Sequence, residues 1–290
     1  MTGRTYDRRT QDLGNIVVLE HCNVRVPDQT MATLFYVVGL GGTRDPYLMV
    51  GLQNMWINLG QQQFHLPTGK DQAFPGYIGI VLQDFDALPA RLAEVKPQLA
   101  GTAYDFAVED KHIVATCPWG NRMRLHAPGP EFGDMTLGIP YVEFPVPVGH
   151  AEGIARFYDK VMGSPGTVTP NGGGAVARVR VGMNQELVFR ETSQPIPPYD
   201  GHHIAVYVAD FSGPHARLLE RGLVTEESSQ IQYRFKDIVD PDSGKHLFTI
   251  EHEVRCVTHP MFLRPLINRN PAQRQPTYQR GRDAYVPGLV

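Results

Sequence analysis

An internal repeat is the feature of this sequence that most restricts its fold. A Val-Pro pair followed by a Phe-Tyr pair occurs in both halves of the chain, as Val26-Pro27 with Phe35-Tyr36 and as Val146-Pro147 with Phe157-Tyr158. The segment from Tyr77 to Phe85 also matches the segment from His203 to Phe211, because each ends in an Asp-Phe pair at the same spacing. Several matches in the same order indicate a duplicated chain.

Each half of the chain is itself double, because His21 precedes Asp28 at the same spacing as Tyr77 precedes Asp84. Runs rich in Val, Ile, Tyr and Phe predict strands. Shorter patterns predict four helices, over Gln29–Val38, Asp86–Val95, Ala151–Met162 and Ser212–Gly222. A strand, a helix and several strands follow one another four times, which predicts an α+β fold with mostly antiparallel sheets. We expect two tandem domains, over residues 15–128 and 137–253, each of paired βαβββ units that form an open cup-shaped sheet.

The composition excludes several classes of function. The 27 basic and 30 acidic side chains give a net charge of −3, which provides no electrostatic surface for nucleic acid or an anionic membrane. No apolar run has the roughly 20 residues that a membrane helix requires. The three cysteines are far apart in the sequence, so we expect neither a disulfide framework nor a thiolate zinc site. These features predict a cytoplasmic protein that acts on a small molecule.

The segment 254–290 differs from the rest of the chain, because it contains six arginines, no lysine and several prolines. Such a composition rarely forms a core of its own. Two interpretations are open: a disordered end, or an arm that wraps a neighbouring subunit and presents guanidinium groups to its carboxylates. The apolar residues Met261-Phe262-Leu263 favour the arm, and with it a homo-oligomer.

These repeated motifs resemble the vicinal oxygen chelate superfamily, which includes glyoxalases, bleomycin- and fosfomycin-resistance proteins and type I extradiol dioxygenases. The resemblance rests on the His21 to Asp28 pattern, the helix ending near Leu40-Gly41, the His203 to Phe211 segment, and Asp240-Pro241 before a final strand with Glu251. It extends over roughly residues 15–253, and the two-domain layout is most similar to the extradiol dioxygenases. In that superfamily, residues on the first, fourth, fifth and eighth strands of a cup hold one divalent metal, which chelates vicinal oxygens of the substrate.

The resemblance implies a metal site in the C-terminal cup. His203 occupies the fifth-strand position and Glu251 suits the eighth. The first-strand position is Tyr141, and Glu143 faces the same side two residues later, so either side chain could be the third ligand. A carboxylate is the easier ligand, because a phenol must first lose a proton with a pKa of about 10. One histidine and carboxylates suit Fe(II) best, with Mn(II) or Zn(II) as alternatives.

The N-terminal cup is less suited to a metal. His21 and Tyr77 take its first-strand and fifth-strand positions, but Arg124 stands where a glutamate would be expected. A cation there opposes a metal, so we expect this cup to be structural or to bind an anionic group. His21 is interpreted as a hydrogen-bonded sheet histidine, and His65 has no assigned role.

Two further residues are candidates for proton transfer near the metal: His246, which opens the final strand, and Tyr233 on the strand before it. The resemblance implies a metal-dependent oxidoreductase, similar to the extradiol dioxygenases, or a lyase that acts on a small, oxygen-rich, aromatic substrate. The alternative is a metal-free small-molecule binding protein of the bleomycin-resistance type. Metal content would distinguish the two.

Overall fold

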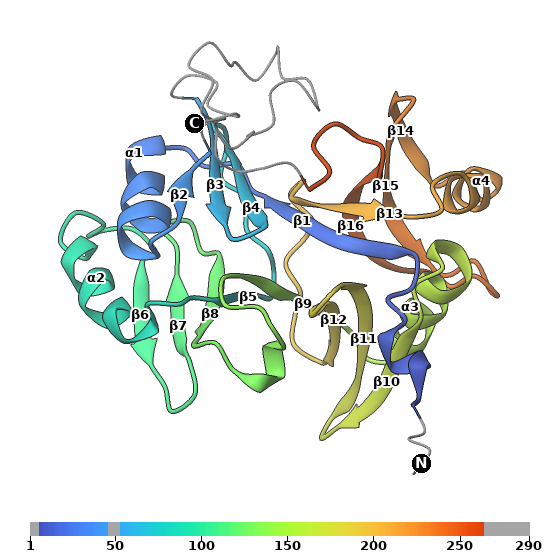
Figure 1. Ribbon diagram of the computed structural model, residues 1–290, viewed down its shortest axis with the longest axis horizontal. Helices are drawn as coiled ribbons and strands as arrows, with labels where there is room; N and C mark the ends of the chain where they lie inside the picture. The colour runs from blue at the N-terminus through green and yellow to red at the C-terminus, as the bar shows by residue number, and fades with distance from the viewer. Residues whose placement is uncertain (1–5, 46–52, 264–290) are drawn as a thin grey trace, which may run out of the picture.

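The computed structural model describes residues 6–45 and 53–263, and within them four similar units follow one another (Figure 1). The first unit consists of β1 (Ile16–Asn23), α1 (Gln29–Ala32), β2 (Thr43–Arg44), β3 (Asn54–Leu59) and β4 (Gln62–Pro67). The second consists of β5 (Tyr77–Val81), α2 (Leu88–Val95), β6 (Asp105–Val108), β7 (Ile113–Thr116) and β8 (Arg122–His126). The third consists of β9 (Gly138–Pro147), α3 (Ala151–Phe157), β10 (Gly166–Asn171), β11 (Gly174–Gly182) and β12 (Gln185–Thr192). The fourth consists of β13 (His203–Val208), α4 (Ser212–Glu220), β14 (Val224–Ser229), β15 (Gln232–Val239) and β16 (His246–Cys256).

The four helices lie where the sequence predicts them. The side chain of Asp28 begins α1 by accepting hydrogen bonds from the backbone N–H groups of Thr30 and Met31 at 2.7 and 2.9 Å, which satisfies two donors that a helix start leaves unpaired. Both α1 and α3 continue as π-helical turns, over Thr33–Gly39 and Tyr158–Met162. The repeated Phe-Tyr pairs lie in the first of these turns and at the junction of α3 with the second, and their rings are buried in the core. The α+β fold of βαβββ units is confirmed.

The strands form two eight-stranded sheets that combine units across the predicted domain boundary. Sheet A pairs the first and fourth units in the order β14-β15-β16-β13-β1-β4-β3-β2. Sheet B pairs the second and third units in the order β10-β11-β12-β9-β5-β8-β7-β6. We had expected each half of the chain to pair its own two units. The central contacts are instead β1 with β13 and β5 with β9, both antiparallel.

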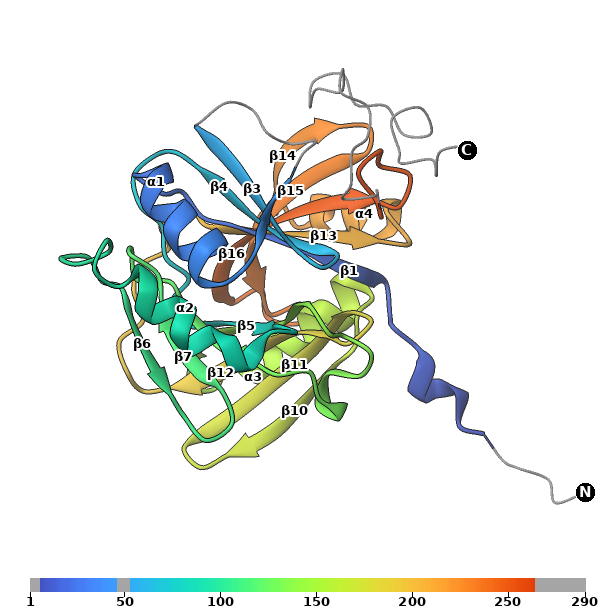
Figure 2. The same cartoon turned by 60° about the vertical axis from the view of Figure 1, so that its left-hand side comes forward.

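One hydrophobic core lies between the two sheets. In Figure 2 sheet A lies above sheet B, with α2 and α3 between them, and α3 contacts strands of both sheets. Phe248 of sheet A packs against Phe144 and Phe189 of sheet B, with ring centroids 5.4 and 5.9 Å apart. Because the side chains of a strand alternate between its two faces, the other face of each sheet points away from this core. The molecule therefore presents two separate outer sheet faces.

The predicted C-terminal arm begins inside the last strand, because β16 continues to Cys256. Arg255, assigned to the arm, is buried in sheet A instead. Phe262 packs on the ring of Tyr207 at 5.0 Å, and residues 264–290 lie outside the described residues, so oligomerisation through the arm stays a prediction. All three cysteines are buried and free. Among the described residues, no helix combines the length and the apolar character needed to cross a membrane.

Candidate metal centre

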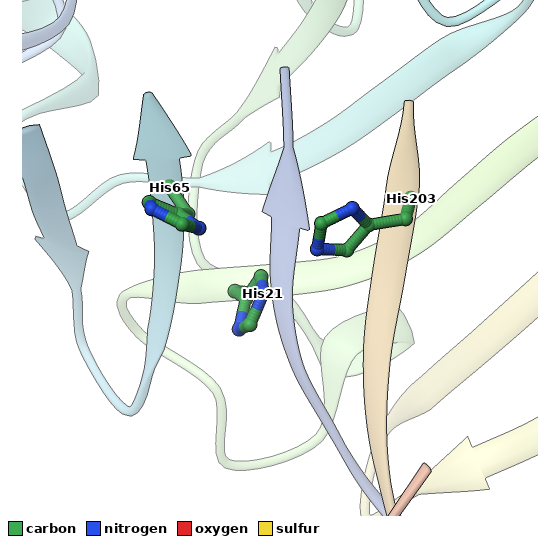
Figure 3. A group of neighbouring side chains, drawn as sticks. All are labelled: His21, His65 and His203. Atoms are coloured by element: carbon green, nitrogen blue, oxygen red, sulfur yellow. The ribbon is translucent and has the colours of Figure 1, made fainter. Parts of the chain in front are cut away.

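Three histidines converge on the outer face of sheet A (Figure 3). His21 lies on β1, His65 on β4 and His203 on β13, and one ring nitrogen of each lies within 4.8 Å of the others. The ring centroid of His21 is 5.8 Å from that of His65 and 5.7 Å from that of His203. The three side chains therefore come from adjacent strands, two of them in the first unit and one in the fourth.

A β-bulge positions His21. The register between β1 and β13 shifts between Leu19 and His21, so Glu20 is an extra residue in β1. The carboxylate of Glu20 accepts a hydrogen bond from Nδ1 of His21 at 3.0 Å and another from the hydroxyl of Tyr207 at 2.9 Å. This bond fixes the imidazole ring, and Nε2 of His21 is buried with no hydrogen-bond partner in the described part of the chain.

His65 is held on both sides by amides. Its Nδ1 lies 2.6 Å from the side-chain nitrogen of Asn23, and its Nε2 lies 2.7 Å from the side-chain oxygen of Asn54. The ring of His65 also stacks on Trp56, with centroids 3.8 Å apart. Burial, with His21 nearby, lowers the pKa of His65 to about 2. His65 is therefore neutral at ordinary pH, the form in which imidazole binds a metal.

His203 faces two carboxylates of β16. Its Nδ1 lies 3.5 Å from Glu251 and its Nε2 lies 3.6 Å from Glu253. Burial holds the pKa of His203 well below its ordinary value, and His21 lowers it further. His203 is thus also neutral, and its Nε2 has no hydrogen-bond partner among the residues that the structure describes.

Two arginines neutralise the carboxylates beside the histidines. Arg234 donates to Glu251 at 2.5 Å and to Glu253, and Arg255 donates to Glu20 at 2.5 Å and contacts Glu253. Burial is the largest single effect and would raise the pKa of Glu20 and of Glu253, but the charge of Arg255 and the other polar neighbours together outweigh it and lower both to about 2. These carboxylates are therefore ionised, and they are poor proton acceptors near neutral pH.

The donor set fits a divalent transition metal. Among the described residues, the buried Nε2 atoms of His21 and His203 have no hydrogen-bond partner and are therefore available to a metal. His65 would exchange one amide hydrogen bond for a metal bond. Metal–nitrogen bonds of about 2.0–2.1 Å place neighbouring ligand nitrogens roughly 3 Å apart, so only small side-chain movements are needed from the observed separations. The carboxylate of Glu253, 3.6 Å from Nε2 of His203, could complete the set.

The structure does not bring together the four ligands predicted from the sequence. His203 and Glu251 are cross-strand partners in sheet A, as expected. Tyr141 and Glu143 lie on β9 in sheet B, so neither closes a site beside His203. Glu143 instead accepts hydrogen bonds from Arg124 and Arg190, and the hydroxyl of Tyr141 lies 2.9 Å from Nε2 of His126. The physical reason for this correction is the pairing of the fourth unit with the first rather than with the third.

Neither candidate for proton transfer lies at the histidines. His246 is exposed and bonds to Thr249, at the opposite end of β16 from Glu253. Tyr233 faces the other side of sheet A, where its buried ring packs against Phe211 and His215. His202, the neighbour of His203 in the chain, is buried, and its Nδ1 bonds to the carboxylate of Asp200.

Sequence reasoning undervalued His21 and left His65 without a role. The interpretation of His21 as a hydrogen-bonded sheet residue accounts for its Nδ1 but not for its unpartnered Nε2. The signal that could have identified His65 is its place two residues after Gln63 in an alternating strand. Gln63 pairs with His21, and His65 pairs with Asn23, so both histidines lie near the same point of the sheet.

Comparisons with known proteins agree with this architecture. No family model matches the sequence, and no curated protein matches it. Among solved structures, glyoxalase I from Zea mays superposes with a TM-score of 0.58 at 15% identity, over 83% of this chain and 92% of that one. A protein of Bacillus subtilis, described as a proposed dioxygenase, superposes with a TM-score of 0.56 at 13% identity, over 95% of this chain and 93% of that one.

This chain has the vicinal oxygen chelate fold. When the strands of sheet A are counted in chain order, β1, β4, β13 and β16 are the first, fourth, fifth and eighth, the strands from which the resemblance draws ligands. His21, His65 and His203 stand on the first three of these strands, and Glu251 and Glu253 stand on the last. The vicinal oxygen chelate fold thus accounts for residues from opposite ends of the sequence meeting at one point.

Proposed function

We propose that this protein is a metal-dependent enzyme that binds a small, oxygen-rich substrate at sheet A. The observation that supports this proposal is the convergence of His21, His65 and His203 at strand positions typical of vicinal oxygen chelate ligands. Both His65 and His203 are held neutral, so they require no deprotonation before they bind a metal. Imidazole ligands suit Fe(II) and Zn(II), and we favour Fe(II), with Mn(II) or Zn(II) as alternatives.

A bound divalent metal would supply Lewis acidity or a site for O₂. The surrounding residues would orient the histidine ligands and balance the charges of the carboxylates near the metal. Glu20 fixes the ring of His21, and the two asparagines fix that of His65. Arg234 and Arg255 keep the neighbouring carboxylates ionised, which makes those carboxylates weak bases. The substrate should therefore be one whose hydroxyl would become more acidic on a bound metal, such as a catechol or a hydroxy-ketone, because the described residues place no strong base near the histidines.

The reaction class is proposed as an oxidoreductase of the dioxygenase type, with a lyase as the alternative. Both would use chelation of two neighbouring substrate oxygens. Oxygen uptake separates them: a dioxygenase consumes one O₂ for each substrate molecule, whereas a lyase consumes none. A screen of catechols, hydroxy-ketones and thiol adducts, with an oxygen electrode and a product assay, would assign the class.

Metal analysis of protein purified without chelator tests the proposal directly. We expect the wild-type chain to bind close to one equivalent of a transition metal, and His21→Ala, His65→Ala and His203→Ala each to lose most of it, because a three-imidazole set has no spare ligand. His246→Ala is the matched control, since this histidine is exposed and remote from the three. Circular dichroism of each variant confirms that the fold is retained.

The opposite result would favour a metal-free binding protein of the bleomycin-resistance type. That result is less than about a tenth of an equivalent of metal in the wild type, with no gain after anaerobic addition of Fe(II) or Mn(II). Equal metal loss in His246→Ala and His203→Ala would contradict the ligand assignment.

A further inference from the structure

The outer face of sheet B carries a cluster of arginines. Strand alternation and register place five arginine side chains on this face, together with the carboxylates of Glu143 and Glu186. We call these five residues the arginine face: Arg122, Arg124, Arg178, Arg180 and Arg190. The positive charges therefore outnumber the carboxylates by three on this face.

The arginine face carries basic side chains at the strand positions where the metal centre of sheet A carries acidic ones. In sheet A, His203 on the first strand of its unit pairs with Glu251 on the last strand, and Glu253 follows two residues later. In sheet B, Ile78 pairs with Met123 in the same parallel arrangement, so Arg122 and Arg124 take the places of the two glutamates. Tyr77 correspondingly takes the place of His203, and the hydroxyl of Tyr77 lies 3.3 Å from Arg122. A cation would be repelled here.

The guanidinium groups retain unused donors. Arg124 and Arg190 share one buried carboxylate, that of Glu143, at 3.3 and 2.8 Å. Arg122 and Arg124 also lie over the ring of Tyr77, at 4.4 and 3.7 Å from its centroid. Arg122 also donates to the carbonyl oxygen of Pro75, Arg178 to the carboxylate of Glu186, and Arg180 to the carbonyl oxygen of Asp12. Each guanidinium has five N–H donors, so these bonds still leave further donors on each arginine for an anion.

A cavity of about 590 Å³ opens on the same face. Two residues of the arginine face, Arg178 and Arg180, line this cavity. Glu186, the cross-strand neighbour of Arg180, and Tyr141, the cross-strand neighbour of Glu186, line it as well. Phe132 and Met183 add apolar surface, and Glu131 adds one further carboxylate. A volume of roughly 300–1,000 Å³ with an apolar wall and a few charged groups is typical of a small-molecule site.

We propose that the arginine face of sheet B binds a small organic anion in this cavity, with its carboxylate or phosphate group on the guanidinium groups of Arg178 and Arg180, the two residues of the face that line the cavity. Such a site is separate from the metal centre, because it lies on the other sheet and faces away from the common core. Planar guanidinium groups recognise carboxylates and phosphates through paired hydrogen bonds. Phe132 and Met183 would contact the apolar body of the ligand.

Isothermal titration calorimetry of the full chain at low ionic strength tests this site. The protein is first treated with chelator, so that metal binding makes no contribution. The probes are benzoate and inorganic phosphate, with neutral benzamide as the comparison. We expect saturable binding of benzoate, of phosphate or of both, and none of benzamide. Whichever anion binds identifies the chemical group that the arginines recognise.

Two variants and a control locate the binding. Arg178→Gln removes a half-exposed guanidinium from the cavity wall without uncovering a buried charge. We expect it to weaken binding by about tenfold, the effect of losing one charge-assisted hydrogen-bonded contact. Arg180→Gln removes the other guanidinium of the cavity wall and should weaken binding by a similar factor, provided that circular dichroism shows it folded. Arg221→Gln, on α4, is the control and should leave binding unchanged.

Three outcomes would overturn the proposal. The first is that neither anion saturates the protein, and the second is that benzamide binds as well as benzoate. The third is that Arg221→Gln weakens binding as much as Arg178→Gln, which would indicate general attraction of anions to the protein surface.

Discussion

Replacing Arg255 with methionine should destabilise the protein strongly at neutral pH. The guanidinium of Arg255 is buried and bridges two buried carboxylates, those of Glu20 and Glu253. Methionine has a similar shape and cannot compensate either charge. Removing one partner of a buried ion pair typically costs about 3–5 kcal/mol, because an uncompensated charge is left in a low-dielectric environment.

The pKa values of the two carboxylates give a consistent magnitude. Each pKa is lowered from an ordinary value of 4.5 to about 2 in the folded protein, and Arg255 is the main cause of lowering. A shift of that size corresponds to about 3 kcal/mol for each group as an upper bound. Glu20 keeps the hydroxyl of Tyr207 and Glu253 keeps Arg234, so the loss should fall short of the sum. We expect about 3–5 kcal/mol.

The pH dependence has a definite sign. A carboxylate whose folded pKa is lowered contributes stability above its unfolded pKa, and this contribution is lost as the pH falls through 4.5 towards 2. The wild type loses this stability on acidification, whereas Arg255→Met has already lost it. The difference in free energy of unfolding should therefore be about 1–2 kcal/mol smaller at pH 4 than at pH 7.

Urea unfolding at pH 7 and pH 4, followed by circular dichroism in chelator-containing buffer, measures these differences. Arg178→Met is the control, because its ion pair with Glu186 is half-exposed and should contribute less than about 1 kcal/mol. A double variant, Arg255→Met with Glu20→Gln, should recover part of the loss. A deficit below about 1 kcal/mol at pH 7, or one that grows at pH 4, would refute the reasoning.

Two further predictions concern sheet B. Burial lowers the pKa of His126 to about 4, so the folded protein favours the neutral imidazole, and this stability is lost as the pH falls from 6.5 towards 4. In denaturation curves, His126→Gln should reduce the change in the free energy of unfolding over this pH range by about 1 kcal/mol. A Cβ at Gly76 would lie 1.8 Å from the backbone oxygen of Glu143, so Gly76→Ala should lower stability by roughly 1–3 kcal/mol. Gly173→Ala, where a Cβ meets open space, should leave the thermal midpoint nearly unchanged, and equal effects of both would contradict this steric argument.

The sequence predicted the repeated units because local chemistry determines them. The alternating strands, the Asp28 helix start and the buried Phe-Tyr residues all depend on neighbours close in the chain. His203 and Glu251 were placed together for a related reason: the last strand of a unit returns in parallel beside its first. Such contacts lie within one unit, and the repeat makes them recognisable.

The pairing between units could not be predicted in the same way. The four leading strands β1, β5, β9 and β13 are all apolar on the core face, so β1 is chemically able to pair with β5 as well as with β13. The observed pairing of β1 with β13 occurs together with packing between residues far apart in the chain, such as Phe248 against Phe144. That choice alone decides whether His21 and His65 meet His203 or Tyr77. The third ligand was therefore assigned to Tyr141 or Glu143 on the wrong sheet.

The nesting of the units also dictates an order of events during folding. The two middle units are neighbours in the chain, so sheet B closes a comparatively short loop. Sheet A must join β1 to β13, across the whole length of both middle units. Contacts of high sequence separation form slowly, because the entropy of closing the intervening loop is lost before they add stability. The three histidines therefore lie together only after the fourth unit has docked, and metal uptake during refolding would report the completion of the last sheet.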